Sequence, residues 1–305
     1  MTEENRLAPE EFAFYRAQST FSDPGALTGR YAGLPADPAA LARIVRGLLI
    51  HRAEGGLFQH AIADDRMHDD AETRYVDDIL RLLVERDDAS LTQARDPGDR
   101  FVGVCRDFSL LHCSMLRHAG VPARIRIGFA DYFGPHYGDH VVTEYWDADR
   151  GWLLADAQLA DPAVAAAHGV DFDPMDVPRD RFLVAGTAWR AIRSGGADAK
   201  AYGHQNPARP LVGAWFVAGS VRLDVAALNK VETLLWDVWG AGADSDEGFD
   251  EDTRALFDVP AELTAGEVPF DAVRTLYAED EGLRAPKSVL CLAPFNGPVQ
   301  ATLRA

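Results

Sequence analysis

Apolar residues in the first hundred positions recur at intervals of three and four, which is the spacing of one face of an amphipathic helix. This pattern predicts helices within 37–53, where Asp37 is placed to act as the N-cap, and within 75–88. Turn-forming residues at 96–100 then interrupt the pattern. We therefore predict that residues 1–100 are mainly helical.

Beyond residue 100 the hydrophobic pattern changes from helical to alternating. A helix is predicted from about Cys105 or Arg106 to Ala119, because a glycine and then a proline follow it, as is common at helix ends. Three later segments are predicted to be strands, namely 123–129, 140–146 and 151–158. One helix followed by a meander of strands indicates an α+β fold.

The rest of the chain has less regular patterns. Residues 161–205 are rich in Pro, Asp and Gly and are predicted to be loop-rich. We further predict a strand or strand pair at 214–223, an amphipathic helix at 223–240, an exposed acidic loop at 242–252, and a helix at 269–280 before a poorly defined end. No pattern marks a domain boundary. We therefore predict a single elaborated domain over 1–305, with a mainly helical part at 1–100, the candidate chemistry at 101–160 and a loop-rich and helical extension at 161–305.

Composition narrows the class of protein. The chain has 305 residues, of which 47% are hydrophobic and 26% charged, as in ordinary globular proteins. Its formal net charge of -18 argues against binding to nucleic acid or to anionic membranes, because both would repel it. Three cysteines do not indicate a disulfide framework, the start of the chain lacks signal-peptide features, and no apolar run is long enough to span a bilayer. We expect a cytoplasmic protein with reduced thiols.

The predicted helix at 105–119 carries two of the cysteines in different settings. Cys105 stands at its start, where the helix dipole favours the thiolate, the reactive form of the side chain. Its backbone N–H could also help to bind an oxyanion. Cys113 lies two turns later among leucines and is predicted to be a core residue. Cys105 is therefore the candidate nucleophile.

A cysteine nucleophile needs a histidine, itself oriented by a carboxylate or amide. His140 opens a predicted strand directly after a loop, and Asp156 ends the next strand, so two antiparallel neighbours could bring them together. Asp156 could equally be a turn residue at a strand end. Alternation places Glu144 on the same face as His140, as a possible supporting group. Asp139 could tune His140 or cap the loop, and both interpretations stay open.

The order of these residues along the chain is more specific than any one of them. The stretches GVCRDFSLLHCSMLRHAGVPARIRIGF, GDHVVTEYW and GWLLADAQL together resemble the transglutaminase-like superfamily, whose core is papain-like. The resemblance implies a helix bearing the cysteine, packed on an antiparallel sheet. It also implies that Cys105 is the nucleophile, that His140 is the general base and acid, and that Asp156 orients His140. Segments beyond the core resemble extensions found in bacterial proteins of this superfamily.

Two further positions bear on the resemblance. Many relatives have an aromatic residue where Val142 stands, so their preference for an acyl donor cannot be transferred to this chain. Arg124 matches the arginine of a Pro-Ala-Arg element. We expect it to form an ion pair that supports the corner between helix and strand, with Asp107 as a candidate partner.

The function that these residues favour is acyl transfer through a thioester on Cys105, which forms or cleaves an amide bond on a small or peptidyl substrate, with water or an amine as acceptor. The alternative is a non-catalytic protein that uses a papain-like core for binding or as a scaffold. We expect no metal, because His and Cys lack the tight paired spacing of zinc sites. We expect no cofactor, because phosphate-binding glycine motifs are missing from the sequence. The oligomeric state is left open.

Overall fold

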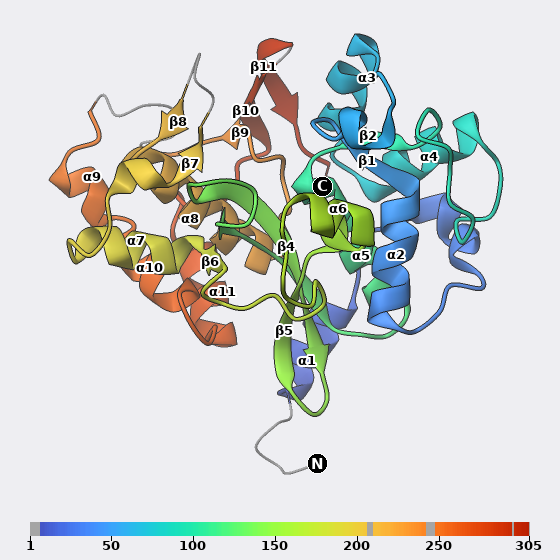
Figure 1. Ribbon diagram of the computed structural model, residues 1–305. Helices are drawn as coiled ribbons and strands as arrows, with labels where there is room; N and C mark the ends of the chain where they lie inside the picture. The colour runs from blue at the N-terminus through green and yellow to red at the C-terminus, as the bar shows by residue number, and fades with distance from the viewer. Residues whose placement is uncertain (1–6, 206–209, 242–247, 295, 305) are drawn as a thin grey trace. The chain divides into compact units, whose positions relative to one another are not determined.

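The computed structural model describes residues 7–205, 210–241, 248–294 and 296–304 (Figure 1). The chain divides into two compact units. Unit 1 comprises Met1–Ile125 and Val142–Val177, and unit 2 comprises Arg126–Val141 and Pro178–Ala305. The single elaborated domain over 1–305 stays a prediction.

The helices that the structure describes in unit 1 include the three predicted from the sequence, which are α2 (Pro38–Leu48), α4 (Val76–Arg86) and α5 (Cys105–His118). The others are α1 (Pro9–Arg16), α3 (Asp64–Asp69) and α6 (Pro162–Ala167). Short 3₁₀ helices lie at Gly25–Tyr31, Gly55–Phe58, Asp70–Glu72 and Ala157–Leu159 (η2 to η5). Asp37 caps α2 as predicted, since its carboxylate accepts a hydrogen bond of 2.7 Å from the backbone N–H of Ala40.

The helix predicted within 37–53 ends earlier than its apolar pattern suggested. Residues after Leu48 form strand β1 (Leu49–His51), which pairs in parallel with β2 (Phe101–Gly103). Both strands are largely buried. Their pairing partners lie about fifty positions apart in the sequence, so a local periodicity cannot reveal them.

Helix α5 forms as predicted, from Cys105 to His118. The backbone N–H of Val104, the residue before the helix, donates a hydrogen bond of 2.9 Å to the carboxylate of Asp107. The helix closes at Ala119, followed by Gly120 with a φ of 86°, a left-handed conformation that favours glycine. Nearly all of α5 is buried, so it forms the centre of the unit 1 core.

Four strands form a sheet in the order β5-β4-β3-β6. They are β3 (Ala123–Ala130), β4 (Gly138–Asp147), β5 (Gly151–Ala155) and β6 (Phe182–Val184). β4 pairs antiparallel with β5 from Thr143↔Ala155 to Asp147↔Gly151, and β3 pairs antiparallel with β6. The three predicted strands are therefore confirmed, except that the last ends at Ala155 and continues as the 3₁₀ helix η5. The predicted α+β class is confirmed.

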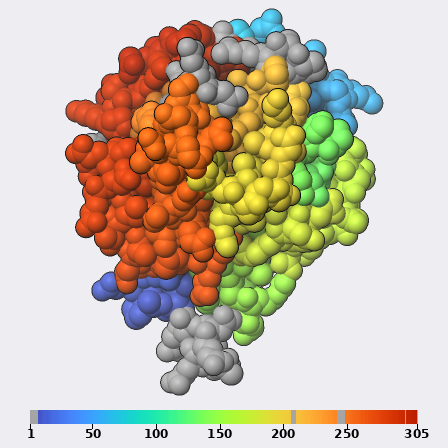
Figure 2. Space-filling view, turned by 90° about the vertical axis from the view of Figure 1, so that its left-hand side faces the viewer, coloured from blue at the N-terminus to red at the C-terminus, as the bar shows by residue number. Residues whose placement is uncertain are grey.

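Unit 2 is built mainly from helices, and its segments, coloured yellow to red, form much of the surface in Figure 2. Its helices are α7 (Ala185–Arg193), α8 (Ala214–Leu228), α9 (Glu251–Ala255), α10 (Asp258–Thr264) and α11 (Phe270–Glu279), with a 3₁₀ helix (η6) at Ala199–Ala201. Its further strands are β7 (Gly203–His204), β8 (Leu211–Val212), β9 (Asp237–Val238), β10 (Ser288–Ala293) and β11 (Gly297–Thr302). Phe129, Trp189, Val217 and Val221 are central residues of its main core cluster.

Several predictions for this part of the chain are wrong. The strand predicted at 214–223 is the first part of helix α8, and the helix predicted at 223–240 ends at Leu228. The reason is that α8 is buried around most of its circumference, so its apolar residues show no helical period. The helix closes where Lys230 takes a left-handed φ of 64°.

Two more predictions need correction, and one other is confirmed. The loop-rich region 161–205 contains α6, β6 and α7, and the end predicted as poorly defined forms the β10–β11 hairpin. α11 confirms the helix predicted at 269–280. Of the acidic loop predicted at 242–252, positions 242–247 lie outside the described residues. Among the helices that the structure describes, none is long and apolar enough to cross a membrane.

Candidate active site

Cys105 is the first residue of α5 and lies directly beyond strand β2. Its thiol is free and its side chain is mostly buried, with 6% of the residue exposed. The backbone N–H groups of Cys105 and Arg106 lie at the open start of the helix, whereas that of Asp107 already donates to the Val104 carbonyl at 2.9 Å. The helix dipole is positive at this end. This position can therefore supply N–H donors to an oxyanion. Cys113, by contrast, is completely buried, as expected of a core thiol.

The turn before Cys105 is held by a buried ion pair. The Asp107 carboxylate accepts the Val104 N–H and also lies 3.1 Å from an Arg106 guanidinium nitrogen. Burial raises the pKa of the Asp107 carboxyl group above its usual value, and the charge of Arg106 opposes this shift. A Cβ atom at Gly103 would lie 3.0 Å from Asp107 Oδ2, which is a tight contact, so glycine fits closely here. The start of α5 is thus tightly constrained.

His140 lies in unit 2, near the start of β4, and is 3% exposed. Three aromatic rings surround it, with centroid distances of 4.8 Å to Phe133, 5.8 Å to Tyr132 and 6.2 Å to Phe182. Their packing around His140 was not predicted from the sequence. Tyr132 and Phe133 are adjacent in the loop before His140, and this pair is the sequence feature that could have indicated two of the rings.

The two residues proposed to support His140 have other partners in the structure. Asp139 Oδ1 lies 3.6 Å from His204 Nδ1 within unit 2. Glu144 is buried, and its Oε2 lies 2.7 Å from Arg124 Nε. A role for either residue in supporting His140 stays a prediction.

The ion pair of Arg124 corrects an expectation. Arg124 pairs with Glu144 and, at 3.7 Å, with Glu11, whereas Asp107 is paired with Arg106 instead. Arg124 and Glu144 stand on β3 and β4, which are neighbours in the sheet order. The Arg124 guanidinium also lies over the Trp152 ring, 3.9 Å from its centroid, a cation–π contact that further orients the arginine.

Asp156 lies in unit 1, one residue beyond the last pair of the β4–β5 ladder, and is 1% exposed. Its Oδ1 accepts a hydrogen bond of 3.0 Å from the backbone N–H of Gln158, so the carboxylate caps η5. Its own backbone N–H donates to the carbonyl of Pro174 at 2.7 Å. The expected turn role is therefore real. Asp156 also directly follows β5, which pairs with β4, the strand on which His140 lies.

A chain of buried polar groups holds this segment in place. The Gln158 side-chain amide donates to Glu54 Oε1 at 2.8 Å, and Arg46 donates to Glu54 Oε2 at 2.6 Å. All three residues are buried. The turn that contains Asp156 is thereby anchored to α2 through side chains alone, which gives the carboxylate a defined position.

A second buried histidine, His112, lies in unit 1. Its Nε2 is 3.1 Å from the carbonyl of Pro38, which can only accept, and its Nδ1 is 3.3 Å from Thr143 Oγ1. Burial lowers the pKa of His112 to about 4, although the nearby charge of Asp156 acts in the opposite direction. His112 is therefore a neutral ring that joins α2, α5 and β4.

His51 is a residue that the sequence reasoning missed. It ends β1 and is paired with Gly103, two residues before Cys105. Its Nδ1 accepts a hydrogen bond of 3.2 Å from the backbone N–H of Ala53. No signal could have revealed it, because the local pattern predicted a helix at this point.

In the described ranges, no group of three or more His, Cys, Asp or Glu side chains is arranged to hold a metal ion.

Comparison with known proteins identifies the region that contains these residues. The family model described as "Transglutaminase-like superfamily" matches residues 64–157. Residues 64–157 form a transglutaminase-like domain. The match starts at α3, so the transglutaminase-like domain begins before the stretch on which the sequence resemblance rested. It includes Cys105, His140 and Asp156, and it indicates cysteine-based catalysis.

Two other comparisons give no further support for a particular function. A crystal structure described as a "putative cysteine protease" from Cytophaga hutchinsonii is 16% identical, with a TM-score of 0.34 over 56% of this chain and 53% of that chain. The chain thus spans about half the length of that protein. No curated protein matches the chain.

Proposed function

We propose that the protein catalyses acyl transfer through a thioester on Cys105, and that it forms or cleaves an amide bond of a small or peptidyl substrate. The observation that carries the proposal is the position of Cys105 at the first turn of a buried helix, inside a transglutaminase-like domain. A thiol at this point lies beside backbone N–H groups that can bind an oxyanion.

In the proposed reaction the Cys105 thiolate attacks the carbonyl carbon of the substrate, and the first-turn N–H groups bind the oxyanion. The carbon–nitrogen bond then breaks, and protonated His140 gives its proton to the leaving amine. Water or a second amine attacks the thioester next, while His140 takes up the proton of the attacking group. The carbon–sulfur bond breaks and the thiolate returns. Asp156 orients the imidazole of His140 and stabilises its charged form.

The proposal requires Cys105, His140 and Asp156 to meet. One feature of the chain supports the histidine–aspartate part of this requirement. β4 is one continuous strand that carries His140 near its start and Thr143 three residues later, and Thr143 is paired with Ala155, the residue before Asp156.

Selective alkylation tests the nucleophile. Iodoacetamide labelling at neutral pH, followed by peptide mass mapping, compares Cys105 with Cys113 and Cys291, which are also free and buried and serve as internal controls. We expect Cys105 to react much faster than either, and His140→Ala to suppress this reaction.

Trapping of the intermediate tests the reaction itself. Intact-mass measurement after exposure to a panel of activated esters and peptide amides is expected to show an acyl adduct that Cys105→Ala lacks and Cys113→Ala keeps. If Cys105 reacts no faster than a free thiol and no donor yields an adduct, acyl transfer is wrong. The protein would then use its transglutaminase-like domain for binding.

A further inference from the structure

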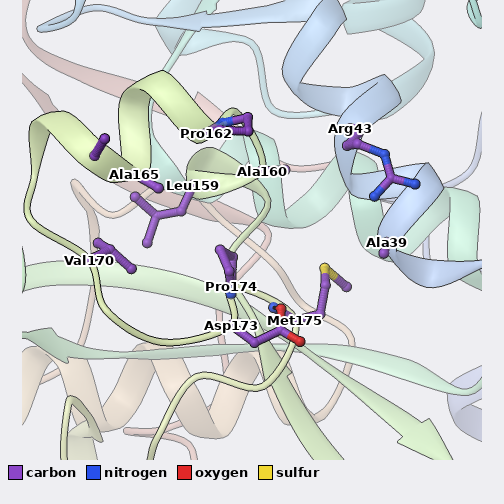
Figure 3. A pocket seen from close by; sticks show the side chains of 11 residues that line it. Ala39, Arg43, Leu159, Ala160, Pro162, Ala165, Val170, Asp173, Pro174 and Met175 are labelled. Atoms are coloured by element: carbon purple, nitrogen blue, oxygen red, sulfur yellow. Dashed lines mark hydrogen bonds between the residues drawn. The ribbon is translucent and has the colours of Figure 1, made fainter.

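A cavity of about 390 Å³ opens in unit 1 between the start of α2, the region of η5 and α6, and residues 173–175 (Figure 3). Most of its lining is aliphatic, including Leu159, Pro162, Ala165, Val170, Pro174 and Met175. This volume lies within the range of pockets that bind small molecules. The apolar lining favours a ligand with an aliphatic middle part.

The cavity carries one positive and one negative side chain, which Figure 3 shows on different walls. Arg43 projects from α2, and its nearest acidic atom is Asp37 Oδ2, at 3.9 Å. The same oxygen of Asp37 already accepts the cap hydrogen bond from Ala40. Arg43 is 62% exposed in its side chain, so its guanidinium is available to a ligand carboxylate.

Asp173 supplies the negative charge on the opposite wall. Its Oδ1 accepts a hydrogen bond of 2.9 Å from the backbone N–H of Met175, which holds the carboxylate in place. It forms no ion pair with the residues that the structure describes. Its second oxygen can therefore accept from a cationic group of a ligand.

The walls of the cavity are held by hydrogen bonds before any ligand arrives. The Asp156 N–H donates to Pro174 O at 2.7 Å, and the Val170 N–H donates to Ala165 O at 3.0 Å. Asp161 caps α6 through the N–H of Ala163, at 2.7 Å. A pocket that is formed in advance loses little conformational entropy on binding.

We propose that this cavity binds a short aliphatic peptide with both termini free. The carboxylate of the peptide pairs with Arg43, its ammonium group pairs with Asp173, and its aliphatic side chains lie against the lining. A simple fatty acid would leave Asp173 unused, and an amine without a carboxylate would leave Arg43 unused. The inference goes beyond acyl transfer, because none of these contacts involves Cys105.

Calorimetric titration of the full chain carrying Cys105→Ala, which prevents turnover, tests the charges. The probe is the dipeptide Ala-Leu, compared with N-acetyl-Ala-Leu and Ala-Leu-amide, each of which lacks one charge. We expect Arg43→Gln to weaken the binding of Ala-Leu about fivefold but to leave the binding of Ala-Leu-amide unchanged. Asp173→Asn keeps the oxygen that accepts the hydrogen bond from the Met175 N–H. It should weaken the binding of Ala-Leu about fivefold and leave the binding of N-acetyl-Ala-Leu unchanged. Arg81→Gln, a change of an exposed arginine on α4, is the matched control and should have no effect.

Two substitutions on α6 test the location. Ala166 lines the cavity and Ala167 does not, and both are exposed, so a phenylalanine at either position should be tolerated by the fold. Ala166→Phe is expected to abolish binding of Ala-Leu, and Ala167→Phe to preserve it. The proposal is overturned if Ala-Leu does not bind, if Ala166→Phe binds it normally, or if the blocked peptides show the same dependence on both charges. Because binding is measured without Cys105, none of these outcomes bears on its alkylation.

Discussion

The two units each contain a buried histidine, and the two rings are held in different ways. His112 in unit 1 is bound at both ring nitrogens, by the Pro38 carbonyl and by Thr143. His140 in unit 2 is packed by Tyr132, Phe133 and Phe182. An imidazole whose two nitrogens have fixed partners stabilises the fold but is poorly suited to move protons. Aromatic packing orients the His140 ring through its faces and edges, and its part in proton transfer stays a proposal.

Removal of His140 is the strongest test of this contrast. His140→Ala is expected to lower kcat/KM for the proposed acyl transfer by about 10³-fold, because the proposed general base and acid is lost. Steady-state kinetics with an activated ester measures the effect. His136→Ala, at an exposed position of the same unit, is the control and should change little. Equal effects of the two substitutions would remove His140 from the proposed mechanism.

The second test concerns Glu54, the buried carboxylate in unit 1 that binds Gln158 and so holds the segment containing Asp156. Glu54→Gln keeps the shape of the side chain but leaves Arg46 without its buried negative partner. We expect the free energy of unfolding to fall by about 3 kcal/mol, measured by urea denaturation. Glu85→Gln breaks an exposed pair with Arg81 and should cost less than about 1 kcal/mol. If the two variants lose the same stability, the buried chain does not hold the Asp156 segment.

The low pKa of His112, about 4, predicts a pH dependence of stability. Between the unfolded value of 6.5 and about 4, the unfolded chain binds a proton that the folded protein excludes. Stability should therefore decrease as the pH falls through this window, by on the order of 3 kcal/mol in total from this group. Urea denaturation at a series of pH values should show a flatter dependence for His112→Gln than for His136→Gln. A slope that His112→Gln leaves unchanged would assign the effect to other groups.

The smallest expected effect concerns the aromatic setting of His140. Phe133→Leu removes the ring that lies 4.8 Å from His140 and should lower the free energy of unfolding by about 1 kcal/mol. If this ring also orients the imidazole, kcat/KM should fall about fivefold. Phe12→Leu, at a partly exposed position, is the control for stability. A loss of stability with unchanged kinetics would limit Phe133 to packing.

Local signals in the sequence predicted part of this structure well. The cap at Asp37, the start and end of α5 and the strands around β4 depend on neighbours within a few residues, and all three were predicted correctly. Helix α8 was not, because a helix buried on most sides has no polar face to show its period. β1 was also missed, because its partner β2 lies far away in the chain.

The candidate site likewise has features that were predicted from the sequence and contacts that were not. Local patterns were enough to predict that Cys105 stands at a helix start and that His140 and Asp156 follow in the order typical of a transglutaminase-like domain, since spacing and order are properties of the chain. Three contacts became visible only in the folded chain: Glu144 pairs with Arg124, aromatic rings pack around His140, and Glu54 anchors the turn after β5. These contacts join residues that are distant in sequence, and their energies depend on burial and geometry, which no local pattern encodes.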